Sequence, residues 1–353
     1  MADPGPTANF RQILLYRPGA LGDLVAIIPF LTKLRQTYPA ARIHLLCSAS
    51  WQWIGQTLAE ETYSVEDPRL LPLFSGGRAN HFPSPSGGFD MAYLFLQNRD
   101  SLFEQGVLQF ARAVRWIQTR PSPELRHCRP TPKSEEINIR QFLHDQEFDG
   151  PMPIPVLRLP DFTEGRPSFM PATTDPGKGL QEGQVLRGSV SSPFDSGTFA
   201  SKSLLCIHPG SGSPAKNWPL ENFLEIARFW RMRGRRVVWT LGPADGDLKD
   251  VLCRQLSAEE RLSAKGDRIC ADLTLPQLCA LYAQPEILWL CNDSGPAHLA
   301  AALGAHGVAI FGASDATLWA PQGMGRIRIL GKRDAFPAVE EVKAALASLA
   351  KFN

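Results

Sequence analysis

Four short loops combine the residue types that bind anions or accept protons. The last of them, at residues 292–304 (NDSGPAHLAAALG), follows an apolar run and has Asp293, Ser294, Gly295 and Pro296 at the start of a predicted helix. A strand that leads into a helix in this way directs backbone N–H groups and the positive end of the helix dipole at one point. We expect that point to bind an anionic group, most often a phosphate.

His298 lies in the same predicted helix. If Leu299 and Leu303 pack on a sheet, His298 remains near the helix start together with Asp293 and Ser294. Each polar residue also has an ordinary interpretation, because Asp293 could be a simple N-cap and His298 a hydrogen-bonded, partly buried histidine. The arrangement as a whole indicates a binding site more strongly than any one of its residues.

A second loop, at residues 208–218 (HPGSGSPAKNW), contains the groups that suit a diphosphate. Gly210 and Gly212 permit a tight turn, Ser211 offers a hydroxyl, and Lys216 offers a positive charge. The loop matches neither a Walker A sequence nor the dinucleotide-binding GxGxxG pattern. A solvated glycine-serine loop with an exposed lysine fits the same residues, so both interpretations stay open.

The loop at residues 18–23 (PGALGD) places a carboxylate at the start of the first predicted helix. Gly19 and Gly22 allow a close backbone approach, and Asp23 opens the helix. Asp23 could only complement the helix dipole. The functional alternative is a general base, because a helix start keeps a carboxylate ionised at neutral pH.

The remaining loop, at residues 242–247 (GPADGD), resembles a metal-binding DxD through Asp245 and Asp247. A pattern this short arises often by chance, so a polar turn that caps the next helix is the favoured interpretation. Hydrogen bonding of Asp245 to a ribose is a third alternative. No other cluster has metal-ligand spacing, so we expect no metal site.

The elements that must position these loops alternate between strand and helix. In the first half, strands are predicted at 12–17, 42–48 and 89–95, and a helix at 24–34 that Pro29 should kink. In the second half, strands are predicted at 204–210, 235–242, 287–292 and 307–312, and an amphipathic helix runs from Pro219 to Gly234. Strand–helix–strand repeats of this kind form parallel sheets, so both halves are predicted to be doubly wound α/β domains. Ligands bind at the carboxyl ends of such strands, which places all four loops at binding edges.

The composition describes a globular chain with two domains. It has 353 residues, 44% hydrophobic and 20% charged, with a net charge of +2 that gives no reason to expect a nucleic acid partner. Seven scattered cysteines without a CxxC pair predict reduced thiols, and no secretory signal or membrane span is recognised. Residues 161–202 are rich in Pro, Gly and Ser and predict a linker or insertion between domains at 10–160 and 203–335, followed by a C-terminal helix at 336–353.

Three blocks of the sequence resemble glycosyltransferase family 9, the lipopolysaccharide heptosyltransferases. They are RPGALGDLVAIIPFLTKLRQTYPAARI, HPGSGSPAKNWPLENFLEIA, and NDSGPAHLAAALG followed by FGASDATLWAP. They occur in the family's order, and the resemblance covers residues 11–48 and 203–320. It implies a GT-B fold, in which two Rossmann-like domains face each other across a cleft, with the acceptor domain first and the nucleotide-sugar domain second.

The resemblance also implies roles for individual residues. Asp23 matches the catalytic base, and Gly19 and Gly22 belong to its loop on the acceptor side. The residues that match the nucleotide-sugar site are Ser211, Gly212, Lys216, Asp293, Ser294, Gly295, Pro296 and His298, and less securely Asp245. The implied reaction is an inverting transfer of heptose from ADP-heptose to a lipid-linked inner-core sugar. It needs no metal or other cofactor, since the ADP-sugar is a co-substrate.

The implied location is cytoplasmic, with any contact to the inner membrane peripheral. Residues 100–202 match the family poorly, and the 161–202 segment is longer and richer in Pro and Gly than the family predicts. Two alternatives therefore stay open: a GT-B transferase with another nucleotide sugar or glycan acceptor, and a non-catalytic nucleotide-sugar-binding protein. A binder would not need a carboxylate at Asp23, so that residue favours an enzyme.

Overall fold

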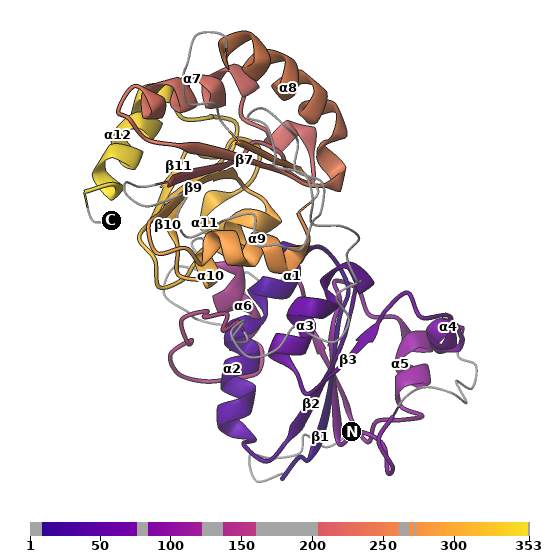
Figure 1. Ribbon diagram of the computed structural model, residues 1–353. Coiled ribbons are helices and arrows are strands. Elements are labelled where there is room, and N and C mark those ends of the chain that lie inside the picture. The colour runs from indigo at the N-terminus through magenta and orange to yellow at the C-terminus, as the bar shows by residue number, and fades with distance from the viewer. Residues whose placement is uncertain are drawn as a thin grey trace. The chain divides into compact units, whose positions relative to one another are not determined.

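The computed structural model divides the chain into two compact units, Met1–Leu157 and Arg158–Asn353. It describes residues 9–75, 84–121, 137–159, 204–260, 268–271 and 273–351. The predicted linker at 161–202 lies outside the described residues. Each unit is a parallel sheet covered by helices on both faces (Figure 1), which confirms the predicted α/β class.

The first unit has a five-stranded sheet in the order β3-β2-β1-β4-β5. Its strands are β1 Gln12–Arg17, β2 Arg42–Cys47, β3 Glu61–Ser64, β4 Met91–Phe95 and β5 Val114–Ile117. All four pairings are parallel. The predicted strand at 89–95 is therefore the fourth strand, because the short strand β3 was not predicted.

The helices of the first unit pack on opposite faces of this sheet. One face is covered by four helices: α1 Leu21–Ala26, α2 Ile28–Thr37, α3 Gln52–Leu58 and α6 Ile139–Asp145. The other face is covered by α4 Leu71–Phe74 and α5 Ser101–Val107 (Figure 1). The short 3₁₀ helices η1 Ala49–Trp51 and η2 Pro68–Leu70 precede α3 and α4. The break at Ile27, one residue before α2, confirms the predicted effect of Pro29, which occupies the first turn of α2.

The second unit has a six-stranded sheet in the order β11-β10-β9-β6-β7-β8. Its strands are β6 Leu204–His208, β7 Val237–Leu241, β8 Arg268–Ala271, β9 Ile287–Asn292, β10 His306–Ile310 and β11 Ile327–Leu330. Every pairing is parallel. The strands β6, β7 and β9 are buried along their whole length, and β8 and β10 apart from their first residue, as expected for a sheet with helices on both faces. The edge strand β11 is only partly buried.

Three helices cover one face of the second sheet: α7 Leu220–Arg231, α8 Gly246–Glu260 and α12 Val339–Leu349. The helices α9 Leu275–Tyr282 and α10 Gly295–Ala302 lie on the other (Figure 1). Short helical turns η4 Pro214–Lys216, η5 Pro243–Asp245 and α11 Ala316–Trp319 follow three of the strands. The predicted helix at the C-terminus is therefore α12, and it packs on α7 and β10 within the second unit.

Both sheets reverse their strand order beside their first strand. In the first unit this switch point lies between β1 and β4, and in the second it lies between β6 and β9. Ligands of doubly wound sheets bind at the carboxyl end of the strands at such a point. The loops that begin at Pro18, Pro209 and Asp293 are therefore at the positions where a ligand is expected.

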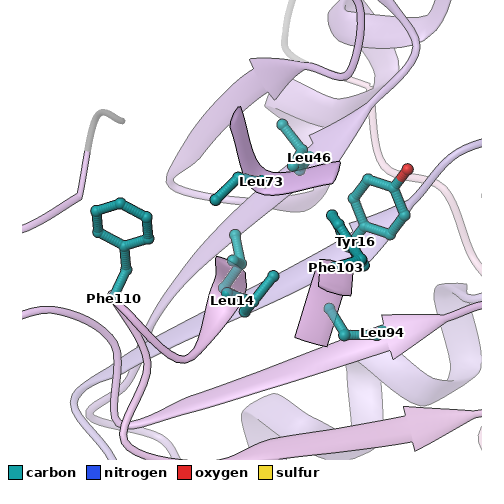
Figure 2. Close-up of a pocket in the computed structure, with 8 residues that line it drawn as sticks. Leu14, Tyr16, Leu46, Leu73, Leu94, Phe103 and Phe110 are labelled. Carbon is teal, nitrogen blue, oxygen red and sulfur yellow. The ribbon is translucent and has the colours of Figure 1, made fainter. Parts of the chain in front are cut away.

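A small apolar pocket in the first unit lies between its sheet and the helices α4 and α5 (Figure 2). It is lined by Leu14, Tyr16, Leu46, Leu73, Leu94, Phe103, Val107 and Phe110. Burial, and to a lesser degree the charge of Glu66, raises the pKa of Tyr16 to about 12. The pocket therefore has no group that could exchange a proton at neutral pH. Side chains alternate along β1, so Tyr16 and Arg17 point to opposite faces.

Among the described residues, no helix is both long enough and apolar enough to cross a membrane.

Candidate functional site

Two loops of the second unit meet at the switch point because Asn292 joins them. Its side-chain amide donates a hydrogen bond to the carbonyl of Pro209 at 2.7 Å, and its carbonyl oxygen accepts one from the Trp218 backbone N–H at 3.0 Å. Asn292 is fully buried at the end of β9, next to β6. The loop after β6 is thereby fixed at both ends against the start of the loop after β9.

Lys216 and Asp293 form an ion pair at this point, although 77 residues separate them in the sequence. The Lys216 ammonium donates to Asp293 Oδ2 at 2.7 Å, and the Ser314 hydroxyl donates to the same oxygen at 2.6 Å. His298 Nε2 lies 3.8 Å from Asp293 Oδ1. We call these four residues the Asp293 cluster. The carboxylate is 5% exposed and the lysine side chain 36%, so the ammonium is the accessible part of the ion pair.

The structure thus brings together three residues that the sequence singled out and adds one that it did not. Ser314 follows β10 at the same edge of the sheet, in the segment FGASDATLWAP. Its place after a parallel strand was the signal that could have identified it.

Ser294 lies at the start of α10 with its hydroxyl unused. It is the N-cap residue in an extended conformation, yet its side chain accepts no capping hydrogen bond. Its Oγ is buried and has no hydrogen-bond partner among the described residues. Gly295 begins the helix, and Pro296 in the first turn contributes no N–H. A buried hydroxyl without a partner is costly, so this site suits a polar ligand atom.

The loop before Lys216 is stabilised from within. The Ser211 hydroxyl lies 2.7 Å from both the Ser213 carbonyl and Asn217 Oδ1, so it holds the loop's conformation. Gly212 is exposed, and a Cβ at this position would have no neighbour within 4 Å. The turn η4 then places Lys216 opposite Asp293. The backbone at Gly212 is thus open to a ligand, whereas the Ser211 side chain is engaged.

The Asp245 side chain packs against the start of this loop. Its Oδ2 accepts a hydrogen bond from the Gly242 backbone N–H at 2.7 Å and lies 3.6 Å from His208 Nε2. The carboxylate is buried and fills the space where a side chain on Gly210 would lie. Burial lowers the pKa of His208, and the Asp245 charge opposes this effect. Asp245 therefore joins the loops after β6 and β7. This is a structural role, whereas the sequence had suggested only a polar turn that caps the next helix.

This contact predicts different outcomes for two glycines. Gly210→Ala would force the new methyl group against the Asp245 carboxylate. We expect it to lower the free energy of unfolding by about 1–3 kcal/mol, the usual cost of overpacking. Thermal unfolding of the purified variant measures this change.

Gly246→Ala is the matched control, because a Cβ there meets nothing within 4 Å and the backbone is already helical, with φ −53°. We expect it to be neutral or stabilising by up to about 1 kcal/mol. Equal destabilisation by the two substitutions would contradict the supporting role of Asp245.

Asp23 belongs to the first unit, at the carboxyl end of β1. It is the third residue of α1, and its Oδ2 accepts the backbone N–H of Ala20 at 3.0 Å, the reciprocal half of a capping box. Its Oδ1 accepts a hydrogen bond from Arg17 Nη2 at 2.9 Å. The Asp23 side chain is 32% exposed, so the carboxylate combines a fixed orientation with access for a substrate.

The glycines of this loop make room for Asp23. Gly19 has φ +120°, which favours glycine, and a Cβ there would lie 2.7 Å from Asp23 Oδ2. The Gly19 carbonyl accepts a hydrogen bond from the Trp51 indole N–H at 3.0 Å. Gly22 directly precedes Asp23 in the first turn of α1. The conformation of the loop is therefore matched to the carboxylate.

Within the part of the chain that the structure describes, no three His, Cys, Asp or Glu side chains are placed to hold a metal ion. The two carboxylates of the DxD-like sequence differ in environment, since Asp245 is buried and Asp247 is exposed.

Comparison with solved structures defines the class of fold. The structure of the E. coli ADP-heptose lipopolysaccharide heptosyltransferase II matches with a TM-score of 0.64 and 20% identity, covering 97% of this chain and 99% of that one. A glycosyltransferase family 9 protein from Veillonella parvula matches with a TM-score of 0.65 and 17% identity, covering 97% and 98%. Together with the two doubly wound sheets, these similarities identify a GT-B fold.

The family follows from the sequence. The model of glycosyltransferase family 9 (heptosyltransferase) matches residues 172–347. The chain belongs to glycosyltransferase family 9. Lipopolysaccharide heptosyltransferase 3 of Escherichia coli is 31% identical over 115 residues, which are 33% of either chain. Lipooligosaccharide heptosyltransferase 2 of Campylobacter jejuni is 30% identical over 121 residues, or 34% of this chain and 37% of the relative. The matched stretch thus spans about a third of the length of these curated relatives.

Proposed function

We propose that this protein is an inverting glycosyltransferase that moves a heptose from ADP-heptose to a hydroxyl of the lipopolysaccharide inner core. The observation that carries the proposal is the Asp293 cluster, with the unused Ser294 hydroxyl beside it at the switch point of the second sheet. Membership of family 9 and the names of the relatives support heptose as the sugar and ADP as the nucleotide.

The nucleotide half of the sugar donor is assigned to the second unit. Lys216 supplies a positive charge that is already oriented by Asp293, and an ammonium has two further N–H groups to offer a diphosphate. The start of α10 adds Gly295 and Ser294, where a phosphate oxygen would accept a hydrogen bond from the Ser294 hydroxyl. The exposed backbone at Gly212 lies in the loop leading to Lys216. We propose that Asp245 lies near the ribose and acts on it mainly through the loop that it holds in place, because its carboxylate already accepts a hydrogen bond from Gly242.

The chemical step is assigned to Asp23 in the first unit. The acceptor hydroxyl attacks the anomeric carbon, and its proton passes to the Asp23 carboxylate. A bond forms between the acceptor oxygen and the anomeric carbon while the bond from that carbon to the phosphate oxygen breaks. ADP leaves with the electron pair, and the configuration inverts because there is one displacement. Lys216 and the start of α10 would stabilise the charge that gathers on ADP, so the proposed reaction uses no metal or other cofactor.

The names of the relatives also support a lipid-linked oligosaccharide acceptor. We place the reaction on the cytoplasmic side of the inner membrane, with peripheral contact to it. The first unit then serves the acceptor and the second the nucleotide sugar.

A ligand screen followed by a transfer assay tests the proposal. ADP is expected to raise the thermal unfolding temperature more than UDP, GDP or CMP, since a ligand at 100 times its Kd stabilises a protein by about 2.7 kcal/mol. Mass spectrometry of a lipopolysaccharide core acceptor incubated with ADP-heptose should then detect one added heptose. Preference for UDP would reject the ADP-heptose assignment, and ADP binding without transfer to any core acceptor would reject catalysis.

A further inference from the structure

Arg17, the last residue of β1, is buried beside the carboxylate that we assign as the base. Its side chain is 4% exposed, and its guanidinium carbon lies 5.9 Å from the centroid of the Phe95 ring on the adjacent strand β4. Burial lowers the pKa of Arg17, and Asp23 opposes that effect. Removing a guanidinium from water is unfavourable unless its hydrogen bonds are satisfied. A buried cation in this position is therefore stable only with an anionic, hydrogen-bonding partner.

That partner is Asp23, which Arg17 contacts twice. Nη2 donates to Asp23 Oδ1 at 2.9 Å and Nε donates to the Asp23 backbone carbonyl at 3.1 Å. The guanidinium is planar and rigid, so two bonds to one residue fix both the start of α1 and the direction of its carboxylate. The backbone N–H of Ala20 holds the second oxygen. The Asp23 carboxylate is thus held in place by hydrogen bonds to both oxygens, while its side chain remains 32% exposed.

We propose that Arg17 is a positioning residue for the transfer reaction, which orients the Asp23 carboxylate toward the acceptor hydroxyl. The proposal rests on the function proposed above. Of the described charged side chains, Arg17 is the one within ion-pair distance of Asp23, and Arg120, which follows β5, acts electrostatically on Arg17. Arg17 touches no reacting atom in this role and acts through Asp23.

Arg17→Gln and Arg17→Lys separate the charge from the geometry. We expect Arg17→Gln to lower kcat by about tenfold or more, the loss of one charge-assisted hydrogen bond. The KM for ADP-heptose should stay unchanged, because the nucleotide sugar is assigned to the second unit. Arg17→Lys keeps the charge, but its kcat should also fall, because an ammonium cannot reproduce the planar pair of bonds.

A role limited to folding would change the amount of folded protein and leave kcat per folded molecule unchanged. ADP affinity, which is assigned to the second unit, should be unchanged in both variants and reports on intact protein. A folded Arg17→Gln enzyme with the wild-type kcat would overturn the proposal. If Arg17→Gln does not fold, wild-type kcat in Arg17→Lys would overturn it equally.

The variant Asp23→Asn separates a failure of the role proposed for Arg17 from a failure of the proposed function. An inactive Asp23→Asn enzyme beside wild-type behaviour of both Arg17 variants would reject Arg17 alone. Full activity of Asp23→Asn would reject the assignment of the base, and the role of Arg17 with it.

Discussion

Asp23→Asn is expected to lower the rate of heptose transfer by about 10²–10⁴-fold, the usual contribution of a general base. The amide retains the shape of the side chain but cannot accept the proton of the acceptor hydroxyl. Its oxygen can still accept one of the two hydrogen bonds, from Arg17 or from Ala20, that the carboxylate receives. ADP affinity should be nearly unchanged. Steady-state kinetics with ADP-heptose and a core acceptor, beside calorimetry with ADP, measure the two quantities.

Asp90→Asn is the matched control in the same unit. Asp90 accepts hydrogen bonds from the backbone N–H groups of Arg11 and Gln12 at 2.8 and 3.0 Å, and it forms an ion pair with Arg112. It precedes β4, so it lies at the amino edge of the sheet, away from the edge with Asp23. The control variant loses a similar set of contacts and should keep its activity. Equal rates for Asp23→Asn and the wild type would remove Asp23 from the mechanism.

Lys216→Ala is expected to raise the Kd for ADP by about 10–100-fold, since hydrogen bonds to charged groups contribute about 1.5–3 kcal/mol. The substitution removes the cation and leaves the buried Asp293 carboxylate with Ser314 as its remaining short contact. The rate of transfer should fall as well, because the charge on the departing diphosphate grows in the transition state. Isothermal calorimetry gives the affinity, and kcat at saturating ADP-heptose gives the effect on the chemical step.

Lys343→Ala is the corresponding control in the second unit. Lys343 forms ion pairs with Glu225 and Glu340 at 2.6 Å on the face covered by α7 and α12. Its loss removes the same charge at a position outside the switch point. An ADP affinity that is equally weakened in both variants would assign the effect of Lys216 to overall charge, and an unchanged affinity in Lys216→Ala would end its diphosphate role.

The sequence predicted the parts of this fold that depend on local patterns. Apolar runs identified the central strands of both sheets but not the four edge strands β3, β5, β8 and β11, and Pro29 identified the break between α1 and α2. Strand β3 was missed because its four residues, ETYS, are partly exposed and contain only two residues with high strand propensity. An edge strand of this length depends on pairing with β2 more than on its own composition.

The loops that form the candidate site could be predicted from the sequence, whereas the contacts between their side chains could not. Parallel strands gather their carboxyl ends at one edge, so Lys216 and Asp293 were placed at the same edge before their ion pair was known. The engagement of Ser211 within its loop and the burial of Asp245 against Gly210 depend on distances that no spacing encodes. Arg17 was overlooked because an arginine at the end of a strand ordinarily extends into solvent, whereas here it is 4% exposed and donates two hydrogen bonds to Asp23 of α1.

The ion pair between Lys216 and Asp293 bears on how a nucleotide sugar would be selected. Opposite charges 2.7 Å apart nearly cancel at a distance, so this pair adds little to the long-range attraction of a diphosphate. Recognition at this edge would then arise at contact, when a phosphate oxygen takes N–H groups of the ammonium that Asp293 does not occupy. An association rate governed by short-range fit depends weakly on ionic strength, in contrast to sites that draw anions in with unpaired cations.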